Sequence, residues 1–387
     1  MTAGPLTGTT VLDFSTVGPA TRCSRLLADY GARVVKVGAP PRAGAAPIVP
    51  PFHAYSGQRG LERVQIDLKS PAGKDAFLRL AAAVDVVIES FRPGVVDRLG
   101  IGYDAVSAAN PGIVYCSTSG YGQFGPYAAR AGHDINYLAA GGYLHMSERT
   151  ADGRPPVPGA TVADIAAGGL HAAAAILAAL VGRAATGEGA YLDVSVADGV
   201  LWMLSLYVDE YLATGEAPGP GHYILTGRYA CYDVYRAGDG GWLAVGAIEP
   251  GFWVNLCRLL GLEQWSDHQT DDDVQDQIRA DLRAAFAQRT RGEWVALLAD
   301  ADTCVAPVLD IAEVAADPQF AARGAIVEAT HPRRPPFRQL GPLLAGTPRQ
   351  PTYELRDATL TDTPSLLAEA GLPAAEIEAL LAEGVIG

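Results

Sequence analysis

The chain has 387 residues, of which 49% are hydrophobic, and a formal net charge of −14. This length exceeds that of one ordinary core and predicts two domains. The acidic balance argues against a nucleic-acid partner, which requires a basic face. The five cysteines form no CxxC pair, so neither a disulfide framework nor a zinc site is indicated and a reducing compartment is expected.

The first 120 residues alternate between strand-like and helix-like segments. Strands are expected at 10–15, 33–37, 64–68, 84–89 and 113–117, and helices at 20–30 and 74–83. Strand–helix–strand units of this length form parallel pairs with right-handed crossovers. We therefore predict an α/β fold whose large domain is Rossmann-like and doubly wound.

The rest of the chain predicts a second, smaller domain. Helices are expected at 164–181 and 197–213, and a Pro/Gly-rich linker at 215–221 follows them. We predict a large domain at 1–214, a small α+β domain at 222–330 and a C-terminal segment at 331–387 that ends in a helix pair. The longest apolar run, 170–181, is too short to span a bilayer. With no signal-peptide pattern at the N-terminus, the cytoplasm is the expected location.

Several common nucleotide and hydrolase motifs are absent from the sequence. No G-x-G-x-x-G follows the first strand, which disfavours a nicotinamide or flavin dinucleotide. The sequence also lacks a G-x-x-x-x-G-K-[ST] loop and a G-x-S-x-G elbow. ATP-dependent P-loop chemistry and serine hydrolysis therefore have no sequence support.

Three segments concentrate side chains suited to catalysis: GHDINY at 132–137, GATVADIAAGG at 159–169 and GAIEP at 246–250. Asp164 stands where a helix should begin, as an N-cap or beside free N–H groups that attract an anion. The small residues at 168–169 would let a ligand approach that turn. His133 is a surface histidine or, in a pocket, a general base, because imidazoles titrate near neutral pH. Glu249 is a turn carboxylate or a site residue.

Together with motifs along the whole chain, these segments resemble the family III CoA-transferases (CaiB/BaiF superfamily), and within them the α-methylacyl-CoA racemase branch. The motifs are LxGxxVLDFS, LADYGARVVKV, DLKS, ESFRPGVVDRLGIGY, SGYGQFGP, TGEGAYLDVSVADG and DTCVAPVL. The resemblance implies an interlocked homodimer in which both chain ends belong to the large domain. Active sites would lie between the large domain of one subunit and the small domain of the other.

Carried over by position, the resemblance makes His133 and Asp164 an acid/base pair and Glu249 the carboxylate that orients the histidine. Helix N–H groups at Asp164 would stabilise an enolate oxygen. The acyl-CoA would contact Asp134, Tyr137, Tyr232, Lys69, Arg92 and Arg98. Coenzyme A enters as part of the substrate, with no tightly bound cofactor and no metal.

Three functions remain open from the sequence. They are racemisation of a 2-methyl-type acyl-CoA, CoA transfer through an Asp164 anhydride, and acyl-CoA binding without catalysis. The histidine at 133 favours racemisation, since the transferase branch generally has an apolar or aromatic residue there.

The chain departs from the racemase pattern at 38–41, 60–63 and 225–230. Arg42 is expected to supply a cation missing from the first of these. Arg228 in the third predicts a smaller or carboxylated acyl group.

Overall fold

The computed structural model describes residues 4–41, 51–55, 59–346, 349–357 and 359–387, which fall into two compact units. The first unit comprises 1–143, 158–205 and 318–387, and the second comprises 144–157 and 206–317. The predicted domain boundaries lie at 214, 222 and 330, whereas the units change over at 205/206 and 317/318. Arg42 lies outside the described residues.

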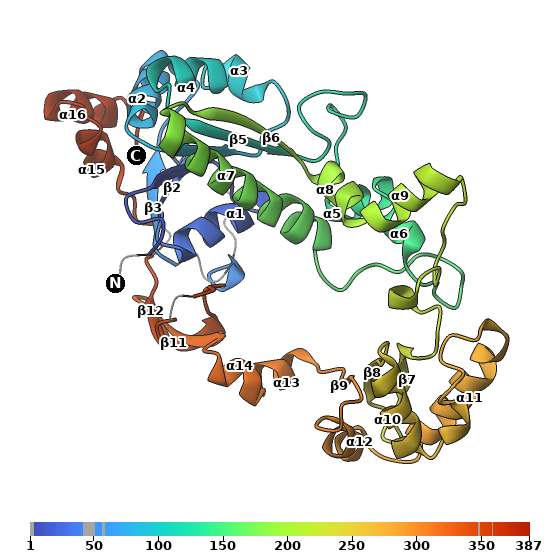
Figure 1. Ribbon diagram of the computed structural model, residues 1–387. Coiled ribbons are helices and arrows are strands. Elements are labelled where there is room, and N and C mark those ends of the chain that lie inside the picture. The colour runs from blue at the N-terminus through green and yellow to red at the C-terminus, as the bar shows by residue number, and fades with distance from the viewer. Residues whose placement is uncertain (1–3, 42–50, 56–58, 347–348, 358) are drawn as a thin grey trace. The chain divides into compact units, whose positions relative to one another are not determined.

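A six-stranded parallel sheet forms the centre of the first unit (Figure 1). In spatial order its strands are β3 (Leu61–Gln65), β2 (Arg33–Gly38), β1 (Thr10–Asp13), β4 (Val86–Glu89), β5 (Val114–Ser119) and β6 (Ala190–Ser195). This 3-2-1-4-5-6 order is that of doubly wound nucleotide-binding folds, whose ligands bind where the order reverses, here at the carboxyl ends of β1 and β4. The predicted Rossmann-like domain is confirmed.

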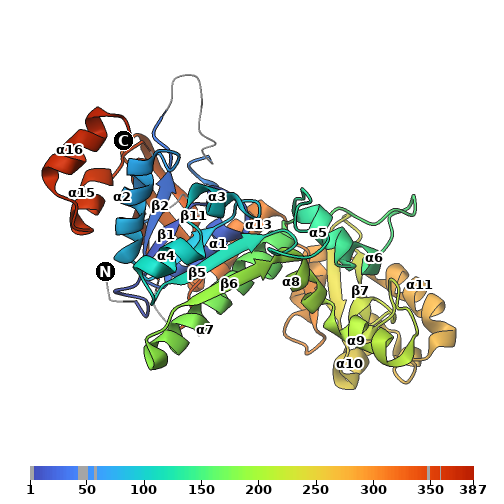
Figure 2. The ribbon, with the colours of Figure 1, turned by 90° about the horizontal axis from the view of Figure 1, so that it is seen from above.

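Alternation along the strands divides the core between the two faces of this sheet. Val34 and Val86 belong to one buried cluster and Val35 and Val87 to another, because successive strand residues point to opposite faces. Helices α1 (Gly18–Asp29) and α7 (His171–Thr186) cover the first face; α2 (Pro71–Ala82), α4 (Tyr103–Ala109), α15 (Thr363–Glu369) and α16 (Ala374–Ala382) cover the second (Figure 2). The remaining helices of this unit are α3 (Val95–Leu99), α5 (Asp134–Ala140), α8 (Val196–Met203) and α14 (Pro318–Ala322).

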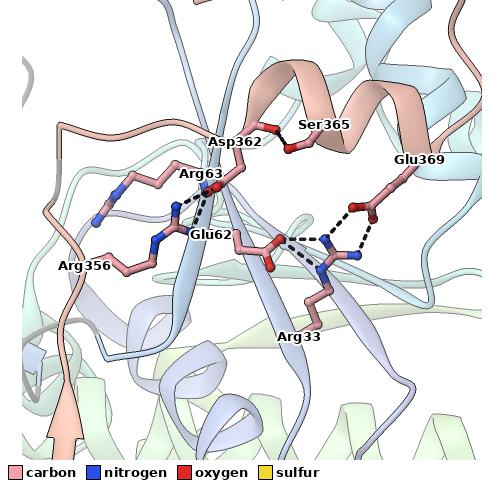
Figure 3. A network of polar contacts seen from close by, with 7 residues as sticks. All are labelled: Arg33, Glu62, Arg63, Arg356, Asp362, Ser365 and Glu369. Atoms are coloured by element: carbon pink, nitrogen blue, oxygen red, sulfur yellow. Dashed lines mark hydrogen bonds and ion pairs between the residues drawn. The ribbon is translucent and has the colours of Figure 1, made fainter.

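The C-terminal segment returns to the edge of the sheet formed by β3. Asp362 accepts a hydrogen bond from the N–H of Arg63 at 3.0 Å and is held bidentately by Arg356 (Figure 3). Arg33 of β2 bridges Glu62 of β3 and Glu369 of α15 (Figure 3). Both chain ends therefore contribute to one unit.

The first unit has a second sheet whose three strands the sequence analysis missed. Its order is β11 (Arg334–Leu340), β10 (Ile326–His331) and β12 (Thr352–Glu354). The segment at 331–387 was predicted only to end in a helix pair, and Pro335 and Pro336 give β11 an unusual sequence for a strand. Proline is tolerated in an edge strand, where its missing N–H faces away from the ladder, and β11 lies at the edge.

One continuous helix runs from Ala163 to Thr186, formed by η2 (Ala163–Leu170), which has π-helical hydrogen bonding, and α7. It has 24 residues and a mean hydropathy of 1.9 over its most apolar 18-residue stretch, which is 33% buried. By length and composition alone this helix can cross a membrane, so the expectation that the segment is too short was wrong. Within the unit, however, Ala172, Ala173 and Ile176 pack into the core of the sheet.

The second unit is the predicted α+β fold. Its antiparallel sheet has the order β7 (Tyr232–Arg236), β8 (Trp242–Gly246) and β9 (Val305–Pro307). Its helices are α10 (Pro250–Leu260), α11 (Gln275–Phe286), α12 (Arg291–Leu298), α13 (Ile311–Ala316) and the short turns η3 (Ile224–Thr226), η4 (Glu263–Trp265) and η5 (Asp272–Val274). Helices α6 (Tyr143–Met146) and α9 (Ser205–Thr214) begin at its junctions with the first unit. The helix expected at 197–213 is divided into α8 and α9 at Leu204.

Candidate active site

The segment after β5 places His133 at the start of helix α5. His133 is the N-cap, with an extended backbone (φ −129°), and its N–H donates to Asn136 Oδ1 at 3.0 Å. The imidazole is exposed. Tyr137, one turn along, donates from its hydroxyl to Gly132 O at 2.6 Å, and its ring fills the space beside Gly120 and Gly132. The segment that carries His133 is therefore fixed from both sides.

Asp164 lies inside the first turn of η2 and is not the N-cap that the sequence suggested. Val162 is the capping residue, and its own backbone is already helical. The N–H of Asp164 donates instead to the Asp134 carboxylate, Oδ1, at 2.8 Å. A carboxylate thirty positions earlier thus satisfies a free N–H of this helix and brings the 132–137 and 159–169 segments together.

The environment of the Asp164 carboxyl raises its pKa. Burial is the largest cause, and the negative charge of Asp134 adds to it. Arg22 and His133 act in the opposite direction and favour the ionised form. Burial, with Asp164 as the next cause, also raises the pKa of Tyr137 to about 12, so its phenol is a hydrogen-bond donor at neutral pH. Asp164 therefore holds a proton more readily than an exposed aspartate does.

Glycines in η2 allow other helices, and not a ligand, to approach this turn. A Cβ on Gly168 would stand 2.5 Å from Pro19 Cβ, and one on Gly169 would stand 2.7 Å from Arg22 Cβ. Both positions are buried against α1. The expectation that residues 168–169 leave room for a ligand is wrong, because α1 occupies that space.

Three backbone donors around Asp164, where an oxyanion site was expected, already have acceptors. The N–H of Asp164 is taken by Asp134, and the N–H of Ile165 donates to Thr161 O at 3.1 Å. The N–H of Val162 donates to Ala160 O at 3.0 Å. These donors are occupied, so an enolate oxygen would need a different partner.

Glu249 and Tyr232 belong to the second unit. Glu249 is exposed and is the N-cap of α10, and the turn before it is held by Gln269, which donates to Ile248 O at 2.8 Å. Tyr232 begins β7 and pairs with Gly246 of β8. Arg228, from which a free cation was expected, is held bidentately by Asp272 at 3.1 and 2.8 Å. That guanidinium is therefore not free to recognise an acyl group.

Comparisons with known proteins identify the family of this chain. The family model described as CoA-transferase family III matches residues 6–356. The chain belongs to this family. It is 35% identical over 386 residues to human α-methylacyl-CoA racemase, covering 98% of this chain and 97% of that one. It is 32% identical over 345 residues to acetyl-CoA:oxalate CoA-transferase of Acetobacter aceti, covering 84% and 86%.

A CAIB/BAIF family protein from Brucella suis has a similar solved structure, with a TM-score of 0.74 and 27% sequence identity over 99% of this chain and 100% of that one. The chain is therefore an enzyme of the family III CoA-transferase and racemase group, and relatives of both kinds are similar to it.

Three cations of this family III enzyme follow the carboxyl ends of its strands. Lys69 follows β3, Arg92 follows β4, and Arg98 lies on α3 with its side chain turned back over Gly94. All three are exposed, and none forms an ion pair within the part of the chain that the structure describes. In that same part, no group of three or more His, Cys, Asp or Glu side chains is placed to hold a metal ion.

Sequence reasoning missed one contact and one residue near Asp164. The capping of Asp164 by Asp134 depends on a contact across thirty positions, which no local pattern reports. Arg22 left a clearer signal, since it is a charged residue near the start of a helix whose earlier residues include Pro19 and Ala20. A cation three residues after the first βα turn faces the ligand end of a doubly wound sheet.

Proposed function

We propose that this family III enzyme inverts the α-carbon of a 2-substituted, 2-methyl-type acyl-CoA thioester. The observation that supports the proposal is the Asp134–Asp164 hydrogen bond, which joins the segment that carries His133 to the helix that carries Asp164. His133 is close enough to lower the pKa of Asp164, so the two groups are electrostatically coupled. Inversion needs such a pair, because a proton leaves one face of the carbon and another arrives on the opposite face.

In this mechanism neutral His133 removes the α-proton and the C–H electron pair passes into the thioester as an enolate. Protonated Asp164 then delivers a proton to the other face, which leaves imidazolium and carboxylate. The opposite enantiomer uses these two groups in the reverse roles. A raised pKa at Asp164 supports its role as the acid, since a proton donor must be protonated at the working pH.

The rest of the site follows from family membership and the free cations. We place the CoA phosphates on Lys69, Arg92 and Arg98, whose side chains are exposed, with no tightly bound cofactor. Glu249 would orient His133 from the partner of an interlocked homodimer. Exposed apolar residues on α7 and α8, including Val181 and Trp202, support an assembly of more than one chain. Light scattering that gives the mass of a single chain would refute the homodimer.

Deuterium incorporation at C2 tests the chemistry. The enzyme is incubated in D2O with each enantiomer of a 2-methylacyl-CoA and no acceptor acid. His133→Ala should abolish exchange from one enantiomer far more than from the other, and Asp164→Asn should do the converse. Exposed residues give matched controls, with His171→Ala and Asp152→Asn expected to leave both rates unchanged. Equal loss of both enantiomers in the site variants would overturn the two-face mechanism.

CoA transfer is the second candidate, favoured by the similarity to the Acetobacter aceti transferase. In that reaction the Asp164 carboxylate attacks the thioester to form an anhydride and release CoA, whose thiolate then attacks the aspartyl carbonyl to release the donor acid and leave an aspartyl thioester. The acceptor carboxylate attacks this thioester to form a second anhydride and release CoA, which then attacks the acceptor's carbonyl to give the new thioester and restore Asp164. Movement of CoA to a free carboxylic acid, blocked in Asp164→Asn and unaccompanied by C2 exchange, would establish this function in place of the first.

A further inference from the structure

Arg22 is a partly buried cation near Asp164. It lies in the first turns of α1, and its Cβ packs against Gly169 of η2. One of its terminal nitrogens is 3.5 Å from Thr161 Oγ1, three residues before Asp164. The guanidinium carbon stands 4.9 Å from the ring centroid of Tyr55, whose hydroxyl accepts from the N–H of Gly18 at 3.2 Å. Thr161, Gly169 and Tyr55 therefore surround this one side chain.

The guanidinium lacks a charged partner in this setting. Its Nε is buried without a hydrogen-bond acceptor among the described residues, and it forms no ion pair with any carboxylate in the same residues. Arg25, one turn along the helix, differs because it is paired with Asp29 at 2.8 Å. A guanidinium offers five N–H donors in a planar fork that matches a carboxylate, so Arg22 has unused capacity for an anion.

The position of Arg22 also indicates which anion it would bind. It is near enough to Asp164 to lower the pKa of that carboxyl, yet the two groups are not ion-paired. The reacting carbon must lie beside Asp164 if the proposed function holds. A group within reach of both that carbon and Arg22 belongs to the acyl side of the substrate. The CoA phosphates have three other exposed cations available.

We propose that Arg22 is a specificity-determining residue that binds a carboxylate beside Asp164, so that the substrate is a carboxylated acyl-CoA. This proposal rests on the proposed function, which places the acyl group at Asp164. The carboxylate belongs either to the acyl chain itself or to a free acid bound next to the thioester. Arg22 takes the role that the sequence suggested for Arg228, whose guanidinium is already paired with Asp272.

Equilibrium binding tests the proposal without relying on turnover. Dissociation constants are measured by calorimetry for 2-methylsuccinyl-CoA, for 2-methylbutanoyl-CoA, which lacks its free carboxylate, and for CoA alone. The wild-type enzyme should bind the carboxylated ester about tenfold to a hundredfold more tightly than the neutral one. Arg22→Met should remove this preference and leave the affinities for the neutral ester and for CoA unchanged. Arg22→Lys should retain part of it.

Arg79→Met is the matched control, because Arg79 is an exposed arginine of α2 in the same unit and should keep the full preference. Circular dichroism and thermal midpoints check that each variant is folded. Equal affinity of the wild type for both esters together with no Arg22-dependent binding of free 2-methylsuccinate, or an unchanged ester preference in Arg22→Met, would overturn the proposal. A parallel loss of affinity for CoA alone would also overturn it, since Arg22 would then hold a phosphate.

A further titration distinguishes the two sources of the carboxylate. Free 2-methylsuccinate is added to enzyme saturated with CoA. If this acid binds in an Arg22-dependent manner, and the enzyme binds the carboxylated and neutral esters equally well, the site is assigned to a free acid. The outcome is also separable from that of the proposed function. If the enzyme prefers the carboxylated ester but shows no C2 exchange, the proposed role of Arg22 stands and the proton chemistry is refuted. If both esters exchange at C2 with equal kcat/KM and bind with equal affinity, and the free acid shows no Arg22-dependent binding, only the role of Arg22 is refuted.

Discussion

Glu89 is a buried carboxyl whose ionisation should make the stability of the first unit depend on pH. It ends β4, is 1% exposed, and lies in register with Ser117 of β5. Its Oε2 accepts from the N–H of Phe91 at 2.7 Å. Burial is the largest cause that raises the pKa of Glu89 to about 7, and the charges of Asp97 and Asp193 add to it.

The sign and size of the effect follow from this pKa. Below about pH 4.5 the carboxyl is protonated in both the folded and the unfolded chain, so its contribution does not change with pH. Between about 4.5 and 7 the unfolded chain loses this proton and the folded chain keeps it. Unfolding then releases a proton, and the free energy of unfolding falls as pH rises. A difference of roughly 2.5 pKa units corresponds to about 3 kcal/mol lost by pH 8.

Glu89→Gln removes the ionisation and keeps the shape, because the amide can still accept from Phe91 and donate to Ser117. We expect the variant to match the wild type at pH 4.5 and to be more stable by up to about 3 kcal/mol at pH 8. Hydrogen–deuterium exchange of β4 and β5 across this range, corrected for intrinsic exchange, measures the difference, with β7 and β8 of the second unit as internal reference. Glu378→Gln, at an exposed site on α16, should keep the wild-type slope. Parallel pH profiles for Glu89→Gln and the wild type would refute the reasoning.

Two further substitutions test the packing beneath the site. Lys36→Met should lower the free energy of unfolding by about 3–5 kcal/mol, because it leaves the fully buried carboxylate of Asp13 without its partner. The double variant with Asp13→Asn should recover at least half of that loss in urea titrations. Gly199→Ala should cost about 1–3 kcal/mol, since its Cβ would stand 2.3 Å from Ala167 O of η2. At the exposed position Gly182 of α7 an added Cβ meets nothing within 4 Å, so Gly182→Ala should instead raise the free energy of unfolding by up to about 1 kcal/mol. Similar effects of the two alanine substitutions on the thermal midpoint would contradict this account.

The fold was predictable where local pattern and tertiary environment agree. The runs at 34–35 and 86–87 are β-branched on both faces, as a strand covered by helices on both sides requires, and both lie in the predicted strands. Prediction failed where the environment overrides local preference. The prolines of β11 are tolerated because β11 is an edge strand of its sheet. The sequence alone does not reveal which strands pair with it.

The site was predictable as a set of segments but not as a set of contacts. The GHDINY and ADIAAGG segments contain side chains suited to proton transfer, and their residue types can be read directly. The sequence did not reveal that Asp134 caps the helix of Asp164, or that α1 fills the space beside Gly168 and Gly169. Each of these contacts joins positions at least thirty residues apart, so spacing along the chain carries no information about them.

The proposed roles of Arg22 and Asp164 are linked through electrostatics. Arg22 favours the ionised form of Asp164, so a substrate carboxylate bound to Arg22 would neutralise that influence and raise the pKa of Asp164. A higher pKa keeps Asp164 protonated over a wider range, which suits a proton donor and opposes nucleophilic attack by its carboxylate. A carboxylated ester should therefore shift the pH at which Asp164 ionises in the kcat profile upward relative to a neutral ester, and Arg22→Met should abolish the difference. Identical profiles for the two esters in the wild type would separate the two roles, because the bound anion would then be too far from Asp164 to affect its proton.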